Sequence, residues 1–371
     1  MTVSPISISI TLGTRPEAIK LAPVIQQFRC CSAFKTHVIL TGQHREMVEQ
    51  VMQLFELGAD RDLEIMQVKQ TLTDITCRSL RGLETLFQEI QPKLVLVQGD
   101  TTTAFAATLA AFYQQIPVGH VEAGLRTDDL LNPYPEEANR RLISQLAQLN
   151  FAPTALAVEN LKCSKIVGEI HHTGNTVIDA LLTVAQRQPP CEIQGLDWGK
   201  YRTLLATVHR RENWGEPLRD IGRGFLQILE AFPDTALLLP LHRNPTVREP
   251  LQEILGNHPR VFLTEPLDYA ELVGAIARSY LLLTDSGGLQ EEAPSLGKPV
   301  LVLRETTERP EAIEAGTAKL VGTNPTQIVA AASQLLSNAK AYETMATAIN
   351  PFGDGHAAER ILGIVKNYFG L

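Results

Sequence analysis

The sequence predicts an α/β protein of two doubly wound domains, each a parallel sheet covered by helices, with both domains facing a central cleft. Short apolar runs alternate with amphipathic stretches along the chain, which is typical of parallel sheets. The 371 residues suffice for two domains of ordinary size, each with its own core. A polar, proline-rich segment, residues 186–198, separates the apolar runs into two sets. We therefore expect ligands to bind where strands end.

The first set of apolar runs predicts an N-terminal domain over residues 1–176. The runs are short, as buried strands are, and the stretches between them repeat apolar residues at helical spacing. We expect strands at residues 6–12, 37–41, 94–98, 117–121 and 149–152, and helices at 16–28, 45–55, 101–114 and 135–147.

The second set predicts a C-terminal domain over residues 177–352, followed by a segment, 353–371, whose helix packs back on the first domain. We expect strands at residues 204–208, 235–240, 261–264, 280–284 and 299–303, and helices at 218–231, 269–278 and 357–369. Because parallel strands all end at the same edge of their sheet, side chains that follow different strands come close together.

Composition and charge exclude several classes of protein. Hydrophobic content of 44% and charged content of 20% are typical of a soluble globular protein. A net charge of −8 argues against general binding to nucleic acid or to anionic membranes. No apolar run reaches the ~18 residues of a membrane-spanning helix, and no basic leader opens the chain. The five cysteines form no C-x-x-C pair, so we expect reduced thiols in the cytoplasm.

Three short patterns that would indicate a metal or a dinucleotide have simpler explanations. Residues 60–62 have the D-x-D form of metal-dependent glycosyl transfer, but they follow a predicted helix end, so we expect a solvated loop. The G-x-G-x-x-A of residues 353–358 follows no strand, and the G-x-G of residues 222–224 lies inside a helix pattern. We therefore expect neither a metal site nor a bound cofactor.

A glycine pair in the second half of the chain is the most informative feature. Asp285 or Ser286 follows an apolar run and can cap a helix, and Gly287 and Gly288 let a ligand approach its first turn. The backbone N–H groups of such a turn suit a phosphate. Glu292 lies one turn further on the same face, where it can meet a ribose. The alternative is an ordinary strand-to-helix turn.

Charged side chains follow several strands of the first domain. Arg15 opens a helix, where a cation indicates an anionic ligand; the alternative is a solvated loop arginine. Asp100 follows the strand 94–98 and is either a helix cap or a catalytic carboxylate, and Glu122 follows the next strand in a nearly apolar run. Glu136 opens another helix. Three carboxylates that converge on one cleft would form a general acid–base site.

Basic residues follow strands of the second domain. His209, Arg210 and Arg211 end its first strand, His242 follows the next strand, and Arg309 follows the last long strand. Beside a glycine-rich helix start, these groups favour phosphate contact, although a histidine in this place can also be a satisfied residue at the rim.

The motifs, taken together, resemble the non-hydrolysing UDP-N-acetylglucosamine 2-epimerase family. They are GTRPEAIKLAP (13–23), TGQHREM (41–47), QGDTTT (98–103), HVEAGLRT (120–127), PEEANRR (135–141), HHTGNTVID (171–179), HRREN (209–213), DSGGLQEEAPSLGKPVLVLRETTERPEA (285–312) and NPFGDG (350–355). No single motif is unique, but the ordered set is specific and covers nearly the whole chain. The resemblance implies the GT-B fold, which consists of two Rossmann-like domains.

The resemblance also implies an activity and a set of site residues. Members interconvert UDP-N-acetylglucosamine and UDP-N-acetylmannosamine without metal or nicotinamide, through elimination of UDP to 2-acetamidoglucal and re-addition. The residues that would hold UDP are Arg15, His209, Ser286, Gly287, Gly288, Glu292 and Arg309. The catalytic set would be Asp100, Glu122 and Glu136, which handle protons, with His209 and with Lys20 in support of the carboxylates.

Further properties of the family extend to regulation and assembly. Several members bind a second UDP-N-acetylglucosamine as an activator, and Gln43, His44, Gln70, Arg210 and His242 lie in the segments concerned. Glu46 and Lys69 depart from the pattern of the activated members. The family is usually dimeric, so the resemblance implies a cytoplasmic homodimer that serves polysaccharide biosynthesis.

Three other functions compete with epimerisation. A glycosyltransferase of the same fold would need an acceptor surface, and the chain has no apolar or basic stretch suited to one. A hydrolysing epimerase, which releases free N-acetylmannosamine, could use the same residues. A non-catalytic UDP-sugar sensor would not need three carboxylates.

Overall fold

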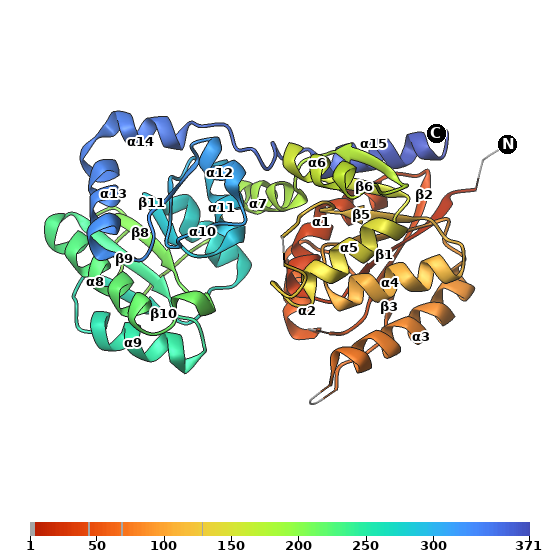
Figure 1. Cartoon of the computed structure of the whole chain (residues 1–371), viewed down its shortest axis with the longest axis horizontal. Helices are drawn as coiled ribbons and strands as arrows, with labels where there is room; N and C mark the ends of the chain where they lie inside the picture. The colour runs from red at the N-terminus through yellow and green to blue at the C-terminus, as the bar shows by residue number, and fades with distance from the viewer. Residues whose placement is uncertain (1–3, 44, 68–69, 128) are drawn as a thin grey trace. The chain divides into compact units, whose positions relative to one another are not determined.

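The computed structural model describes residues 4–43, 45–67, 70–127 and 129–371, and it divides into two compact units (Figure 1). The first unit runs to Ala180 and also includes Phe352–Leu371, and the second unit is Leu181–Pro351. Each unit is a parallel sheet with helices packed against it, so the predicted α/β fold class is confirmed.

The sheet of the first unit has the order β3-β2-β1-β4-β5-β6-β7 in the described part of the chain, and every neighbouring pair is parallel. Its strands are β1 (Ile6–Leu12), β2 (Phe34–Leu40), β3 (Arg61–Asp62), β4 (Leu94–Gln98), β5 (Val118–Val121), β6 (Leu149–Ala152) and β7 (Glu169–His172). Its helices are α1 (Arg15–Cys30), α2 (Arg45–Leu54), α3 (Leu72–Ile90), α4 (Thr102–Tyr113), α5 (Glu136–Leu146), α6 (Ala155–Cys163) and α15 (Ala357–Tyr368). Helix α7 (Thr176–Gln186) begins in the first unit and ends in the second.

The sheet of the second unit has the order β10-β9-β8-β11-β12-β13, again with parallel neighbours throughout. Its strands are β8 (Arg202–Thr207), β9 (Thr235–Pro240), β10 (Val261–Thr264), β11 (Leu281–Thr284), β12 (Val300–Val302) and β13 (Ala318–Leu320). Its helices are α8 (Glu216–Ala231), α9 (Pro245–Leu255), α10 (Tyr269–Arg278), α11 (Gly287–Glu292), α12 (Pro310–Glu314), α13 (Pro325–Ser337) and α14 (Ala339–Ala346), with 3-10 turns at Arg211–Asn213 and Ala293–Leu296.

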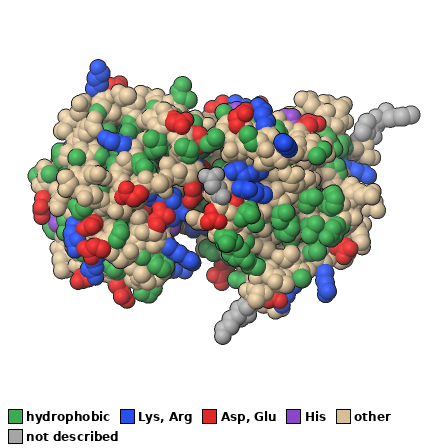
Figure 2. Space-filling view, viewed as in Figure 1, with side chains coloured by type: hydrophobic (Ala, Val, Ile, Leu, Met, Phe, Trp, Pro, Cys, Tyr) green, Lys and Arg blue, Asp and Glu red, His purple; other side chains and the backbone are tan. Residues whose placement is uncertain are grey.

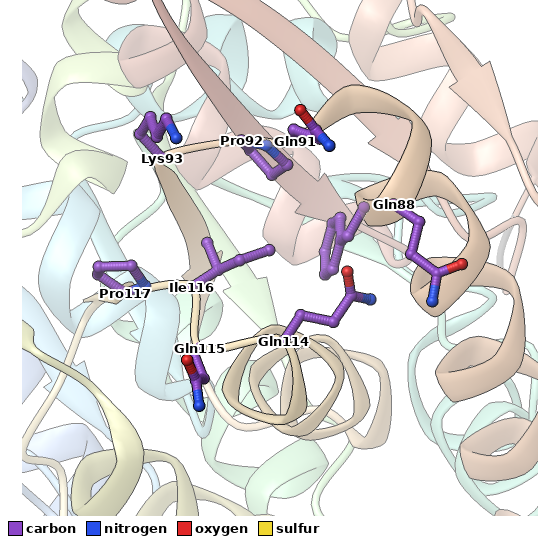
Figure 3. A pocket seen from close by; sticks show the side chains of 9 residues that line it. Gln88, Gln91, Pro92, Lys93, Gln114, Gln115, Ile116 and Pro117 are labelled. Carbon is purple, nitrogen blue, oxygen red and sulfur yellow. The ribbon is translucent and has the colours of Figure 1, made fainter.

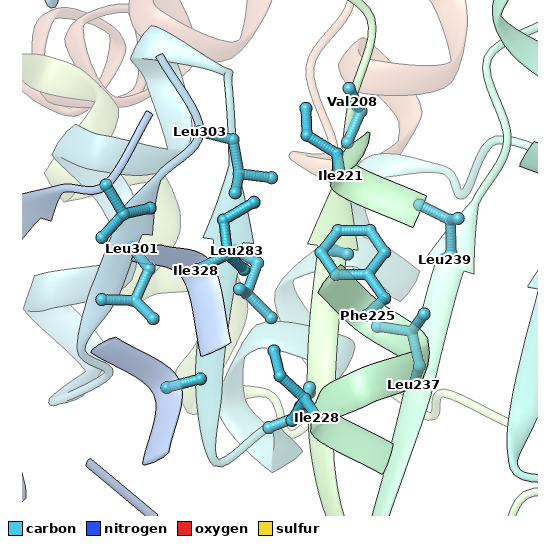
Figure 4. Close-up of a cluster of buried hydrophobic side chains, with 14 of the residues drawn as sticks. Val208, Ile221, Phe225, Ile228, Leu237, Leu239, Leu283, Leu301, Leu303 and Ile328 are labelled. Atoms are coloured by element: carbon cyan, nitrogen blue, oxygen red, sulfur yellow. The ribbon is translucent and has the colours of Figure 1, made fainter. Parts of the chain in front are cut away.

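Helix α8 shows how the sequence builds the core of the second unit (Figure 4). Ile221, Phe225 and Ile228 recur at helical spacing, are buried, and pack against sheet residues such as Leu237 and Leu239. The G-x-G of residues 222–224 lies within this helix, as predicted. Burial of each large apolar side chain stabilises such a core by roughly 1.5–3 kcal/mol.

Three short strands were not predicted: β3, β7 and β13. Each lies at an edge of its sheet and is partly exposed, so its residues lack the continuous apolar run of a buried strand. The predicted solvated loop at residues 60–62 is therefore wrong in part. Arg61 and Asp62 are exposed but pair with the end of β2, and Asp60 Oδ2 accepts a hydrogen bond from Val38 N at 2.8 Å.

Helix α15 completes the first unit from the far end of the sequence. It packs against α1, and its first N–H groups are bonded to the carboxylate of Asp179, with Ala357 N at 3.2 Å and Ala358 N at 2.8 Å. Arg360 Nη1 donates to Thr173 O at 3.0 Å. These contacts attach the C-terminal helix to the segment at which α7 begins.

Two candidate active-site clusters

The first cluster is a pocket of about 340 Å³ in the first unit, beside the carboxyl ends of β1, β4 and β5. Lys20, Asp100, Glu122 and Glu136, all predicted site residues, line this pocket. The other lining residues are Thr14, Pro16, Glu17, Gln43, Leu72, Gln98, Gly99, Thr101, Thr102 and Pro135. We call these residues the carboxylate pocket. The parallel topology explains why side chains so distant in sequence meet there.

Glu122 is the most firmly held carboxylate of the pocket. Its side chain is 5% exposed, and Lys20 Nζ lies 2.5 Å from Oε1. Asn175 Nδ2 donates to Oε1 at 3.2 Å, and Gln98 Nε2 donates to Oε2. The backbone of Glu122 has φ of 63°, an uncommon conformation for a residue other than glycine. An ammonium group and two side-chain amides therefore surround this buried carboxylate.

Asp100 pairs with Arg140, whose Nη2 lies 2.8 Å from Oδ2. Burial raises the pKa of Asp100 above its ordinary value, Arg140 opposes this shift, and the charge of Glu122 adds to it. The helix-cap alternative for Asp100 is excluded, because Thr101 caps α4 through its hydroxyl, which accepts from Ala104 N at 3.0 Å. Asp100 thus does not cap α4, and its carboxyl group lies in the carboxylate pocket beside Arg140.

Arg140 is itself fixed by a buried carboxylate. Glu137 Oε2 lies 3.5 Å from Arg140 Nε, and Glu137 Oε1 lies 2.5 Å from Arg141 Nε. Glu137 Oε2 also accepts from Thr127 N at 3.0 Å. Next to it in sequence, Glu136 is half-buried and is the first residue of α5, where the helix dipole favours a negative charge.

Two residues of this region escaped the sequence predictions. Glu17 is buried and accepts from Gly13 N at 2.9 Å, Thr14 N at 2.7 Å and Thr101 Oγ1 at 2.7 Å, so it ties the turn after β1 to the turn after β4. Burial raises its pKa, against the opposing effect of these hydrogen bonds. The Thr-x-x-Glu spacing of a capping box was the available signal.

The other missed residue is His120, which is fully buried in β5. Its Nε2 lies 2.7 Å from Gly99 O, and burial lowers its pKa to about 4. The ring is therefore neutral at pH 7, and Nε2–H donates to Gly99, the positive-φ residue that precedes Asp100.

Arg15 begins α1 and is half-buried, next to Pro16 of the carboxylate pocket.

The second cluster surrounds the start of α11 in the second unit. Ser286 is the residue before the helix, but its side chain makes no capping bond. Asp285 is fully buried and accepts from His209 N at 2.9 Å, Arg210 N at 2.8 Å and Asn213 Nδ2 at 3.1 Å. The interpretation of Asp285 as a cap is therefore wrong, because the carboxylate joins the end of β11 to the loop after β8.

Asp285 also lies against the His209 ring, with Nδ1 at 3.1 Å from Oδ1. Burial alone would raise the pKa of Asp285, but the hydrogen bond and charge of His209 and the backbone N–H groups of Arg210 and His209 hold that pKa below its usual value. The His209 ring stacks on His242, with centroids 6.1 Å apart. The carboxylate therefore fixes the orientation of this histidine pair.

Two arginines lie over Gly287. A methyl group built on Gly287 would be 3.6 Å from Arg210 Nη2 and 3.9 Å from the Arg309 guanidinium carbon. Arg309 Nε donates to the buried Glu291, and Arg210 Nη1 lies 3.7 Å from Glu308 Oε1. The absence of a side chain at Gly287 therefore leaves room for a group between the helix and two guanidinium ions.

Glu292 is buried at the end of α11. Tyr269 Oη donates to Glu292 Oε1 at 2.8 Å, whereas Oε2 lies 3.8 Å from a methyl group built on Gly288. The structure thus brings His209, Ser286, Gly287, Glu292 and Arg309 into one neighbourhood of the second unit. The predicted UDP-binding residue Arg15 belongs to the first unit.

The residues predicted for a second ligand fall in different parts of the chain. Gln43 lines the carboxylate pocket and accepts from Thr103 Oγ1 at 2.6 Å. Gln70 bonds locally, with Oε1 accepting from Gln67 N at 3.1 Å. Arg210 and His242 lie in the second unit, and His44 lies outside the described residues, as does Lys69.

A pocket of about 470 Å³ lies at the opposite edge of the first sheet, before the amino ends of β4 and β5 (Figure 3). Its lining residues are Phe87, Gln88, Gln91, Pro92, Lys93, Gln114, Gln115, Ile116 and Pro117. Amides and one lysine surround it, without a carboxylate among these residues. The larger of these two pockets therefore lacks the carboxyl groups that line the smaller one.

Within the described ranges, no group of three or more His, Cys, Asp and Glu side chains is placed to hold a metal ion. Among the same residues, no helix combines the length and the apolar character needed to cross a membrane.

Comparisons with known proteins show the family to which the chain belongs. The sequence profile of the family UDP-N-acetylglucosamine 2-epimerase matches residues 26–366. The UDP-N-acetylglucosamine 2-epimerase of Salmonella typhimurium is 49% identical over 365 residues, which cover 96% of this chain and 97% of that protein.

Two solved structures are similar over almost the whole chain. The UDP-GlcNAc 2-epimerase of Neisseria meningitidis bound to UDP-GlcNAc has a TM-score of 0.88 at 46% identity, covering 98% of this chain and 100% of the other. The enzyme of Methanocaldococcus jannaschii in complex with UDP-GlcNAc and UDP has a TM-score of 0.80 at 33% identity, with coverage of 98% and 100%.

Proposed function

Because the chain belongs to the UDP-N-acetylglucosamine 2-epimerase family, we propose that it interconverts UDP-N-acetylglucosamine and UDP-N-acetylmannosamine. The observation that carries the proposal is the carboxylate pocket, in which Asp100, Glu122 and Glu136 meet Lys20. The relatives that bind UDP-GlcNAc and UDP support the same substrate class.

The proposed reaction begins with loss of UDP from carbon 1 of the sugar. The proton on carbon 2 is not next to a carbonyl, so it is a poor acid until the C1–O bond breaks and positive charge develops beside it. A carboxylate then takes the proton, and its C–H electrons form the double bond of 2-acetamidoglucal. Re-addition of UDP at carbon 1, with a proton delivered by a second carboxyl group to the other face of carbon 2, gives the epimer. Proton exchange with water then returns both carboxyl groups to their starting forms.

In this mechanism the first unit handles protons. The pKa of Asp100 is raised by burial, which brings the group closer to the operating pH of a general acid or base. Glu122, which pairs with Lys20, suits a base on another face of the sugar. Glu136 is the third acid–base group.

The second unit would hold the UDP. The diphosphate carries negative charge that increases as it leaves, and Arg309, Arg210 and His209 supply positive charge or N–H donors beside Gly287. Charge-assisted hydrogen bonds of this kind stabilise a departing anion. Glu292, close to Gly288, would accept from the ribose hydroxyls.

Two observations weigh against two of the three competing functions. A UDP-sugar sensor has no need of the buried Glu122–Lys20 pair, and a glycosyltransferase has no need of three carboxylates in one pocket. A hydrolysing epimerase shares the residues but releases a sugar without UDP, so the products distinguish it.

The test is incubation with UDP-N-acetylglucosamine in deuterated water, followed by NMR and mass spectrometry of the products. Epimerisation places deuterium on carbon 2 of a sugar that is still linked to UDP. The Glu122→Gln variant, which cannot exchange a proton at this position, serves as the control. A product with ordinary hydrogen at carbon 2, or free N-acetylmannosamine as the main product, would contradict the proposal.

Assembly as a homodimer and a cytoplasmic location belong to the same proposal. Hydrophobic side chains gather over α4 and α5 of the first unit (Figure 2), and exposed residues there include Phe112, Tyr113 and Leu142. An exposed apolar patch of this kind supports contact with a partner. The pathway would be polysaccharide biosynthesis, in which an N-acetylmannosamine donor is consumed.

A further inference from the structure

Tyr269 makes a contact that the proposed mechanism does not use. It is the first residue of α10, whose N-terminal end is capped by a capping box of Asp268 and Glu271, and it is 6% exposed. Its hydroxyl donates to Glu292 Oε1 at 2.8 Å. A buried tyrosine hydroxyl usually has a partner, but here the partner is a carboxylate at the candidate UDP site.

The geometry of Glu292 gives this hydrogen bond a consequence. The last torsion of a glutamate side chain is broad, so a carboxylate without fixed donors can rotate. Tyr269 fixes Oε1 of Glu292 through its hydrogen bond. The other oxygen, Oε2, lies 3.8 Å from a methyl group built on Gly288, which is on the same face of the helix as Glu292. Any larger side chain at position 288 would fill the space in front of Oε2.

We propose that Tyr269 is a positioning residue that sets the preference of the site for ribose over deoxyribose nucleotides. The inference rests on the proposed function, because it takes Glu292 as the acceptor for a ribose hydroxyl. An ionised carboxylate only accepts hydrogen bonds, so it recognises hydroxyl donors and gains nothing from a sugar without them. A site built to bond a hydroxyl discriminates against the analogue that lacks it. Tyr269 keeps the plane of the carboxylate in the direction that makes this bond.

The chain offers a matched control for the loss of a tyrosine hydroxyl. Tyr342 Oη donates to Tyr280 O at 2.9 Å, in the same unit and away from α11. Tyr269→Phe and Tyr342→Phe therefore both remove a partly or fully buried hydroxyl that has one identified acceptor. Only Tyr269→Phe removes a hydrogen bond to a carboxylate that faces Gly288, that of Glu292.

The experiment measures the affinity of the full chain for UDP and for 2′,3′-dideoxy-UDP by calorimetry. The wild-type protein binds UDP more tightly than the dideoxy nucleotide. Tyr269→Phe weakens UDP binding about 3- to 10-fold, the size of one hydrogen bond, and leaves the affinity for the dideoxy nucleotide unchanged. Tyr342→Phe changes neither affinity.

Glu292→Ala shows whether Tyr269 acts through the carboxylate. In that background, adding Tyr269→Phe leaves the ratio of the two affinities as it is. An equal loss for both nucleotides in Tyr269→Phe, or no loss for either, overturns the positioning role. A wild-type protein that binds both nucleotides equally overturns the ribose contact of Glu292 alone, whereas a wild-type protein that does not bind UDP overturns the proposed function as well.

Discussion

At the scale of single residues, the carboxylates of the first unit differ in their surroundings. Glu122 is locked between Lys20 and two amides, while Asp100 has one guanidinium partner and a raised pKa. Similar carboxyl groups in different environments can divide the work of an acid and a base.

We expect Asp100→Asn, Glu122→Gln and Glu136→Gln each to lower kcat by at least ~10²-fold, because each substitution removes a proton-transfer group while keeping its shape. The affinity for UDP, measured by calorimetry, stays within a few-fold. The control is Glu169→Gln, an exposed carboxylate on β7, which leaves kcat unchanged. Near-normal turnover in all three variants would show that the pocket is not where protons move.

A pH profile can isolate Asp100. Arg140 lowers the pKa of Asp100 by its charge, so Arg140→Gln removes that effect and raises the pKa. We expect the limb of the kcat/KM profile that Asp100 governs to move to higher pH. The matched control is Arg141→Gln, because Arg141 contacts Glu137 but is not among the groups that shift Asp100. A profile that moves equally in both variants would contradict the assignment.

His120 makes folding stability depend on pH. Its pKa falls from 6.5 to about 4 on folding, so between these values the unfolded chain binds more protons than the folded chain. The free energy of unfolding therefore decreases as the pH falls through this window, by up to about 3 kcal/mol for this residue. His120→Gln flattens that slope in urea titrations at pH 4 to 6.5. If the free energy of unfolding depended on pH equally in the wild type and in this variant, folding would not lower the pKa of His120.

The convergence of charged side chains was predictable where they follow a buried strand or open a helix. Asp100, Glu122 and Glu136 were predicted to converge, and the structure brings them to one pocket. Asp285 or Ser286 was predicted to cap α11, and Ser286 is the residue at that position. Asp285 instead accepts hydrogen bonds from the loop after β8, some seventy residues earlier in the chain. Sequence spacing reveals partners within one element, and long-range partners of a buried group follow only from the topology.

At the scale of elements, the buried strands were predictable, whereas three of the four edge strands, β3, β7 and β13, were not. Runs such as Leu94–Gln98 are buried along their whole length, so composition alone indicates them. Strand β7, Glu169–His172, is half exposed and charged, and it forms because β6 offers an open edge. Edge strands depend on their neighbour more than on their own residues.

The turn between β11 and α11 is the proposed binding site for the diphosphate of UDP. We expect His209→Ala or Arg309→Ala to weaken UDP binding by ~1.5–3 kcal/mol, the usual size of a lost hydrogen bond to a charged group. The affinity should not respond to EDTA, because these groups are positioned to contact the diphosphate themselves. Arg219→Ala, on α8 and paired with Glu253, is the control. Calorimetry that shows binding abolished by EDTA and restored by magnesium would contradict this arrangement.

At the scale of the whole molecule, the chain exposes apolar surface that a monomer would leave in water. Phe112 and Tyr113 at the end of α4 are 52% and 64% exposed. We expect the wild-type protein to have the mass of a dimer in light scattering, and Phe112→Asp with Tyr113→Asp to have the mass of a monomer. Val167→Asp, at an isolated exposed valine, is the control. A monomeric wild type, or a double variant that is still dimeric, would rule out this face as the contact.

The return of α15 to the first unit has a consequence for how the protein is made. Ribosomes synthesise the chain from its N-terminus, so the second unit emerges complete while the first still lacks the helix that packs on α1. Until Ala357 and Ala358 have been synthesised, the carboxylate of Asp179 lacks two of its hydrogen-bond donors, and one face of α1 is exposed to water. The unit that is translated first is therefore the one that finishes folding last. In nascent chains halted shortly before α15, this incomplete first unit is exposed to chaperones and proteases.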